Sequence, residues 1–151
     1  MGQHPIRLLI AMLCLLGSSW PAAADKPEYA VEYRQGVMSA IAWNVGPMGK
    51  MVKGEIDFDT QRFAFLADRV AVLVPMALEG FTPDTASVKS HAKAALWQHQ
   101  DDFKKRLDEL RSATTELASV AKTGDEAKIR VTFGDTVKMC KSCHDEYQTK
   151  H

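Results

Sequence analysis

Cysteine is scarce in this sequence, and several other signals are missing as well. The 151 residues include only three cysteines, too few to supply the four ligands of a structural zinc site without matching histidines. No apolar run reaches the ~20 residues that a membrane-spanning helix needs. Basic and acidic residues are equal in number, 19 of each, so net charge gives no reason to expect a nucleic-acid partner. The chain also lacks internal repeats and low-complexity tracts.

The first two dozen residues have the layout of a cleavable secretory signal. Arg7 supplies positive charge, residues 8–16 are almost wholly apolar, and an A-x-A-like sequence ends at Ala24. A transmembrane anchor is the alternative, but the apolar stretch is too short for it. We therefore expect residues 1–24 to be removed, leaving residues 25–151 as one domain in the bacterial periplasm without membrane contact.

The mature chain predicts an all-α domain. Glycine and proline divide it into four segments, and each segment carries apolar residues at helical spacing. Asp57 or Asp59 is expected to cap the second segment, and Gly80, Pro83 and Asp84 mark the longest irregular stretch, where a loop crosses. Four segments of this length predict an antiparallel up-down-up-down four-helix bundle. The apolar stripes are Val37, Ile41, Val45, Met48 and Val52; Phe63, Leu66, Val70, Leu73 and Ala77; Phe103, Leu107, Leu110, Thr114, Leu117 and Ala121; and Ile129, Phe133, Val137, Cys140, His144 and Tyr147.

One motif near the C-terminus carries recognisable chemistry. Cys140, Cys143 and His144 form C-x-x-C-H, the attachment signature of c-type haem. On a helix, two sulfurs three residues apart project from one face, where each can form a thioether with a haem vinyl group. The histidine then directs its imidazole at the iron from the same side. The motif predicts one covalently attached haem c per chain, with His144 as the metal ligand.

Three other interpretations of the two cysteines are weaker. A thioredoxin-like redox pair belongs at a helix N-terminus after a strand, and no strand is predicted here. A zinc site would need His91, His99 or His151, whose spacing does not match. A disulfide between residues three apart in a helix is strained.

The opposite face of the iron is open on sequence grounds. A Met sulfur, a water molecule, a gas or nothing could occupy it, and Met38 on the inner stripe of the first segment is the leading candidate. A buried methionine is more often core filler than a ligand. The remaining methionines of the mature chain are Met48, Met51, Met76 and Met139.

With this motif near its C-terminus, the sequence resembles the cytochromes c prime, the high-spin branch of the class II c-type cytochromes. The matching pieces cover essentially all of the mature chain in the family's order. They are Tyr33-Arg34-Gln35 with Met38, Lys53-Gly54 followed by Asp57-Phe58-Asp59, Trp97 with Phe103, and Cys140 to Tyr147. One departure is Gln148, where the family usually has a basic residue.

The resemblance implies a haem in the bundle core with five-coordinate, high-spin iron. Such iron binds nitric oxide and carbon monoxide and discriminates against dioxygen, because the pocket opposite the histidine is apolar and crowded. Met38 matches the residue that closes this face. Arg34 and Gln35 match positions that contact the haem propionates, with solvated surface residues as the alternative.

The same resemblance leaves a second function open. A low-spin branch of the class uses a Met of the first helix as sixth ligand and carries electrons, which would make Met38 an iron ligand. An enzyme with turnover at the haem lacks support, because no His and Arg pair suited to peroxide cleavage is visible. The paired carboxylates Asp108 and Glu109 are typical of a solvated helix face.

The expected partners are small gases and a redox-protein donor. Lys138, Lys141 and Lys150 either steer such a donor or are ordinary surface lysines. The resemblance also implies a homodimer through the first two helices. Val52, Phe58 and Phe65 are candidates for its interface.

Overall fold

The computed structural model describes residues 26–150 and contains the four long helices expected from the sequence. They are α1 (Pro27–Lys53), α2 (Thr60–Glu79), α4 (Gln100–Ala121) and α5 (Glu126–Tyr147). A short 3-10 helix, η1 (Pro83–Ser87), and the five-residue helix α3 (Ala94–Gln98) lie in the connection from α2 to α4, which the sequence indicated only as a loop. The predicted secretory signal lies outside the described residues.

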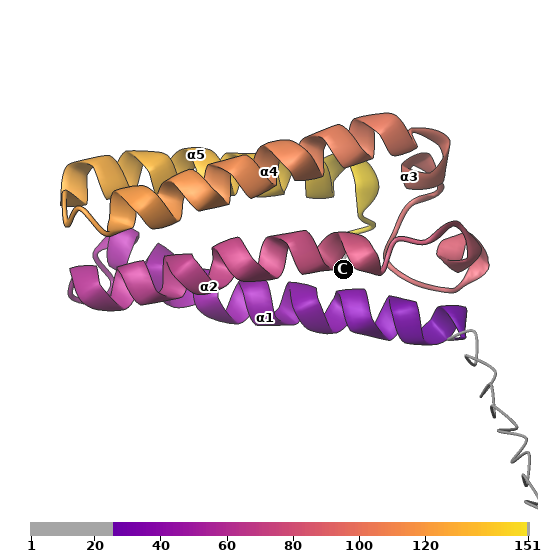
Figure 1. Cartoon of the computed structure of the whole chain (residues 1–151), viewed down its shortest axis with the longest axis horizontal. Coiled ribbons are helices and arrows are strands. Elements are labelled where there is room, and N and C mark those ends of the chain that lie inside the picture. Colours follow the sequence, from indigo (N-terminus) through magenta and orange to yellow (C-terminus); the bar gives the residue numbers. More distant parts are fainter. Residues whose placement is uncertain (1–25, 151) are drawn as a thin grey trace, which may run out of the picture.

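The helices form an antiparallel bundle. Tight turns join α1 to α2 and α4 to α5 at one end, and the crossover with η1 and α3 lies at the other end (Figure 1). The helix pairs that pack along their length are α1 with α2, α2 with α4, and α4 with α5. Between residues 26 and 150, β-structure is limited to one bridge between Ala92 and Gln148. The predicted all-α, up-down-up-down bundle is confirmed.

Local signals in the sequence set the helix boundaries. The Asp59 carboxylate accepts a hydrogen bond from the Arg62 amide at 2.9 Å, so Asp59 rather than Asp57 caps α2. Gly54 ends α1 in the left-handed conformation, with φ of 74°, where a residue without Cβ is favoured. Pro75 does not end α2, which continues to Glu79.

The apolar core consists of two clusters that flank the middle of the bundle. One joins α1, α2, α4 and α5 around Met48, Phe63, Leu117 and Ile129. The other lies at the crossover end and contains Leu96, Phe103, Leu107 and Tyr147. None of the helices within the described residues is long and apolar enough to cross a membrane.

Candidate cofactor-binding site

A cavity of about 650 Å³ lies inside the bundle and is bordered by all four long helices. Its volume falls within the ~300–1,000 Å³ typical of cofactor and ligand sites. Most of its wall is apolar, including Ile41, Val45, Met48, Val70, Val74, Leu107, Leu110, Leu117 and Phe133. The two core clusters therefore meet around a space large enough for a sizeable, mainly apolar molecule.

The cavity opens between α1 and α5. Gln35 and Ala42 of α1 and Val137 and His144 of α5 line it and are themselves exposed. These two helices are not among the pairs that pack along their length. A flat molecule can therefore enter edge-on between them, in contact with residues of both helices.

The three residues of the C-x-x-C-H motif face this cavity from the last turns of α5. Cys140, Cys143 and His144 all line it. Both cysteines are half-buried and neither is joined in a disulfide. Helical spacing places the two sulfurs on neighbouring positions of one face, as the sequence predicts.

Burial influences the ionisation of all three side chains. It raises the pKa values of the Cys140 and Cys143 thiols, although the nearby Arg106 guanidinium opposes the shift at Cys143. Burial also lowers the pKa of the His144 imidazole. His144 is exposed to the open cavity, yet the protein around it removes enough water to favour the neutral ring, which is the form that binds a metal.

The wall contributed by α1 is apolar around Met38, which is half-buried and lines the cavity with Ile41 and Val45. Five residues with hydroxyl groups line the cavity, and three of them donate a hydrogen bond to a carbonyl of their own helix. Ser39 donates to Gln35, Thr114 to Arg111, and Thr136 to Thr132. The middle of the cavity therefore offers few free hydrogen-bond donors.

Arg34 is buried at the crossover end of the cavity, with only 3% of its surface exposed. Its Nη1 donates to the Gly80 carbonyl at 2.7 Å and to Thr85 Oγ1 at 2.8 Å, and its Nη2 donates to Ser90 Oγ at 3.0 Å. Its guanidinium carbon lies 4.6 Å from the centre of the Phe81 ring.

The burial of Arg34 leaves a positive charge without a balancing negative one. No carboxylate among residues 26–150 pairs with Arg34, and burial lowers its pKa. A buried cation without a counter-ion favours an anionic group nearby. The alternative that Arg34 is a solvated surface residue is wrong, whereas Gln35 is exposed at the cavity mouth.

The crossover supplies cavity residues that the sequence did not indicate. Ser90 and His91 line the cavity beside Arg34 and Gln35, and Gln148 joins them from the C-terminal tail. The tail is held there by hydrogen bonds from the Lys93 amide to the Tyr147 carbonyl and from the Thr149 amide to the His91 carbonyl. Polar groups thus collect at one end of a mainly apolar cavity.

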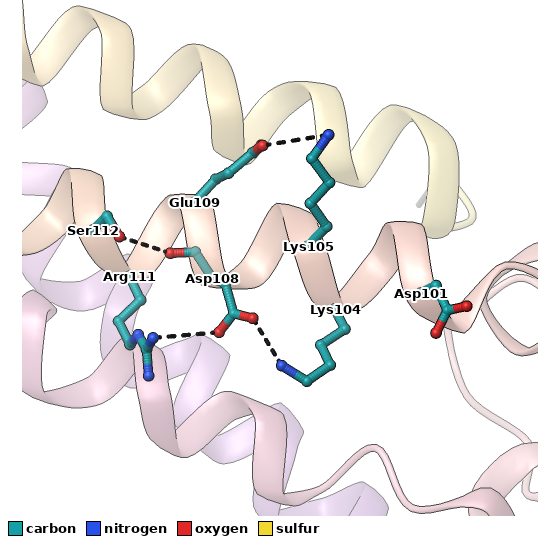
Figure 2. Close-up of a pocket in the computed structure, with 7 residues that line it drawn as sticks. All are labelled: Asp101, Lys104, Lys105, Asp108, Glu109, Arg111 and Ser112. Atoms are coloured by element: carbon teal, nitrogen blue, oxygen red, sulfur yellow. Dashed lines mark hydrogen bonds and ion pairs between the residues drawn. The ribbon is translucent and has the colours of Figure 1, made fainter.

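A second pocket, shallower and lined by charged residues and Ser112, lies on the outer face of α4. Figure 2 shows Asp108 between Lys104 and Arg111, and Glu109 paired with Lys105. Lys104 Nζ lies 2.8 Å from Asp108 Oδ2. Asp108 and Glu109 therefore belong to an exposed, ion-paired helix face, as predicted. Within the described part of the chain, no group of three or more His, Cys, Asp or Glu side chains is arranged to hold a metal ion.

The residues of the large cavity fit a haem. Haem is flat and mainly apolar with two carboxylates on one edge, and the cavity is apolar with a buried cation at one end. All six residues predicted for the site line this cavity, Cys140, Cys143 and His144 from α5 and Arg34, Gln35 and Met38 from α1.

The known proteins to which this chain is similar include several cytochromes c'. The family model described as Cytochrome C' matches residues 29–148. A cytochrome c' of Rubrivivax gelatinosus is 36% identical over 129 residues, covering 83% of this chain and 98% of that protein. The structure of cytochrome c prime from Shewanella frigidimarina is 37% identical with a TM-score of 0.81, covering 83% of this chain and 98% of that one. A nitric oxide complex of a mutant cytochrome c prime from Alcaligenes xylosoxidans is 31% identical with a TM-score of 0.78, covering 84% and 98% of the two chains.

Proposed function

Because this chain belongs to the cytochrome c' family, we propose that it is an exported haem protein that captures nitric oxide and also binds carbon monoxide. The family takes a c-type haem, and nitric oxide complexes are known among its structures. In the proposal, Cys140 and Cys143 would hold one haem covalently, and His144 would be the only strong protein ligand of its iron. The bound haem would supply a five-coordinate, high-spin iron with one open position.

The observation that carries the proposal is the arrangement of residues across one cavity. His144 lines it from α5, and Met38 lines it from α1 among apolar neighbours. The Ser39, Thr114 and Thr136 hydroxyl groups that border the cavity donate to carbonyls of their own helices, and the Tyr147 hydroxyl donates to Asp102. A small apolar gas is therefore accommodated, whereas a ligand that depends on a hydrogen-bond donor is not stabilised.

Arg34 and Gln35 have a separate role at the polar end of the cavity. The Arg34 guanidinium is buried without a carboxylate partner, and the haem propionates would supply the missing negative charge. Its hydrogen bonds to Gly80, Thr85 and Ser90 hold it in place before the cofactor arrives. Gln35, at the mouth, would contribute a second donor from the same helix.

A titration of the ferrous protein with nitric oxide tests the gas-binding function. Wild type is expected to bind nitric oxide stoichiometrically, and Met38→Ala is expected to bind it faster because the wall of α1 is less crowded. Met38→Leu keeps the size of the side chain without its sulfur and is expected to behave like wild type. Haem-loaded wild type that does not respond to nitric oxide would contradict the proposal.

A low-spin electron carrier is the second candidate. The observation that favours it is the thioether of Met38, which lines from α1 the same cavity that His144 lines from α5, since a thioether is a competent haem ligand. Under this alternative, Met38→Leu would open the iron to gases that wild type excludes. We favour the gas-binding function and propose no enzymatic turnover.

The proposal includes a periplasmic location and a homodimer. Residues 1–24 carry the features of an export signal. Of the three residues predicted for a dimer interface, Val52 and Phe58 pack on the core, whereas Phe65 is exposed. Trp43 of α1 and Val72 of α2 are also largely exposed, at 80% and 67%. We propose that a second copy of the chain covers Phe65, Trp43 and Val72. Sedimentation tests this proposal, because wild type should then be a dimer and Phe65→Glu a monomer.

A further inference from the structure

Four side chains form a continuous network on the side of α4 that faces α5. The Tyr147 hydroxyl donates to Asp102 Oδ2 at 2.5 Å, and Arg106 Nε donates to the same oxygen at 2.6 Å. Arg106 Nη1 then donates to Ser142 Oγ at 3.1 Å, and its guanidinium carbon lies 5.9 Å from the centre of the Tyr147 ring. The network connects two residues of α4 with two residues of α5, Ser142 within the haem-binding motif and Tyr147 at the end of the helix.

Arg106 contacts the turn that carries the motif from outside the cavity. Ser142 immediately precedes Cys143 and His144 in the sequence, so the guanidinium contacts the middle of C-x-x-C-H. Asp102 and Arg106 do not line the cavity themselves. Their charges can therefore influence a group in the cavity without touching it.

Other charged side chains also lie near the turn. Lys141 forms an ion pair with Asp145, and the Lys93 ammonium donates to the Asp145 carbonyl. The Arg106 side chain is partly buried, with 34% of its surface accessible, whereas Asp102 is exposed at 46%. The field of Arg106 is thus less screened than that of a fully solvated charge.

We propose that Arg106 is a positioning residue for the turn carrying Cys143 and His144, and that Arg106 and Asp102 act in opposite directions on the reduction potential of the iron bound there. The inference rests on the proposed function, since it requires the haem to be attached. A positive charge nearby favours the ferrous over the ferric iron, which raises the potential. A negative charge has the reverse effect.

The test is the midpoint potential of two variants of the haem-loaded protein. Arg106→Gln removes the positive charge and is expected to lower the potential. Asp102→Asn removes the negative charge but keeps a carbonyl oxygen for the Tyr147 hydroxyl, and is expected to raise it. Each change should alter the ferric–ferrous equilibrium about threefold, or about 30 mV at 59 mV per tenfold for one electron. Both shifts should shrink as salt is added.

A purely structural role would give a different pattern. Both substitutions break the same ion pair, so a structural effect would move the two potentials in the same direction. Arg106→Lys retains the charge and is expected to keep the potential near that of wild type. Lys104 and Asp108 provide a matched control, because they form an ion pair of the same spacing on the side of α4 turned away from α5 (Figure 2).

The outcomes separate this inference from the proposed function. Shifts in the same direction for Arg106→Gln and Asp102→Asn, or shifts no larger than those of Lys104→Gln and Asp108→Asn, would overturn the inference alone. In that case the wild type would still carry haem and bind carbon monoxide. Purified wild type whose mass shows no attached haem would overturn both.

Discussion

Gly80 lies where the crossover begins and packs closely against α1. A Cβ at this position would lie 2.6 Å from both the Ala30 carbonyl oxygen and the Arg34 Cβ, so the backbone or Arg34 would have to move. The Gly80 carbonyl also accepts a hydrogen bond from Arg34. The absence of a side chain here therefore allows the crossover to hold the buried guanidinium.

We expect Gly80→Ala to lower the free energy of unfolding by about 1–3 kcal/mol, the usual cost of overpacking. Gly36→Ala is the control, because nothing lies within 4 Å of a Cβ there. Gly36 is inside α1, so this variant should gain about 0.5–1 kcal/mol. Urea denaturation of the two variants measures both effects, and a stable Gly80→Ala protein would contradict the close approach.

Asn44 is a second residue whose local chemistry predicts a measurable effect. It is buried in α1, its Nδ2 donates to the Ala40 carbonyl at 2.7 Å, and its Oδ1 has no hydrogen-bond partner. Asn44→Leu is expected to raise the free energy of unfolding by about 1–3 kcal/mol, because it removes a buried, unpaired oxygen while filling similar space. Asn44→Asp should have the opposite effect. Destabilisation by leucine in thermal melts would mean that Oδ1 is hydrogen-bonded in solution.

Among the helices, the start of α2 distinguishes two aspartates that the sequence could not separate. Asp59 accepts a hydrogen bond from the Arg62 amide, whereas Asp57 caps no helix. Asp59→Ala should therefore cost about 1 kcal/mol of stability, the usual value for a lost N-cap. Asp57→Ala should be nearly neutral. Equal losses in denaturant titrations would show that the cap is shared.

The contact between α4 and α5 predicts a dependence on alkaline pH. The hydrogen bond to Asp102 raises the pKa of Tyr147 from 10 to about 12. A raised folded-state pKa adds stability that is fully present below pH 10 and is lost as the pH rises towards 12. Unfolding measured across this range should show the loss in wild type and a smaller one in Tyr147→Phe, where Tyr33 is the one tyrosine that retains a raised pKa. Tyr29→Phe, at an exposed position, should match wild type.

For the molecule as a whole, much of the fold and part of the site could be predicted from the sequence. The helices follow from apolar spacing and from caps such as Asp59 and Asp125, which are local signals. Cys140, Cys143 and His144 lie within five consecutive residues, so their shared surface follows from helical geometry alone.

The features that could not be predicted depend on contacts between distant parts of the chain. The partners of Arg34 lie 46 to 56 residues away in the crossover. Tyr147 reaches Asp102 across 45 residues. Val52 and Phe58 resemble exposed interface residues in the sequence, but the packing of α1 and α2 on the core partly covers them. Such contacts depend on how the helices pack against one another, and the spacing of apolar residues within one helix does not specify that packing.

The absorption spectrum of the ferrous protein before and after addition of carbon monoxide tests the central claim most directly. An open position opposite His144 predicts a broad, high-spin Soret band that sharpens and shifts when the gas binds. A sharp, low-spin spectrum that carbon monoxide leaves unchanged would mean that Met38 is bound to the iron, and would contradict the gas-binding function.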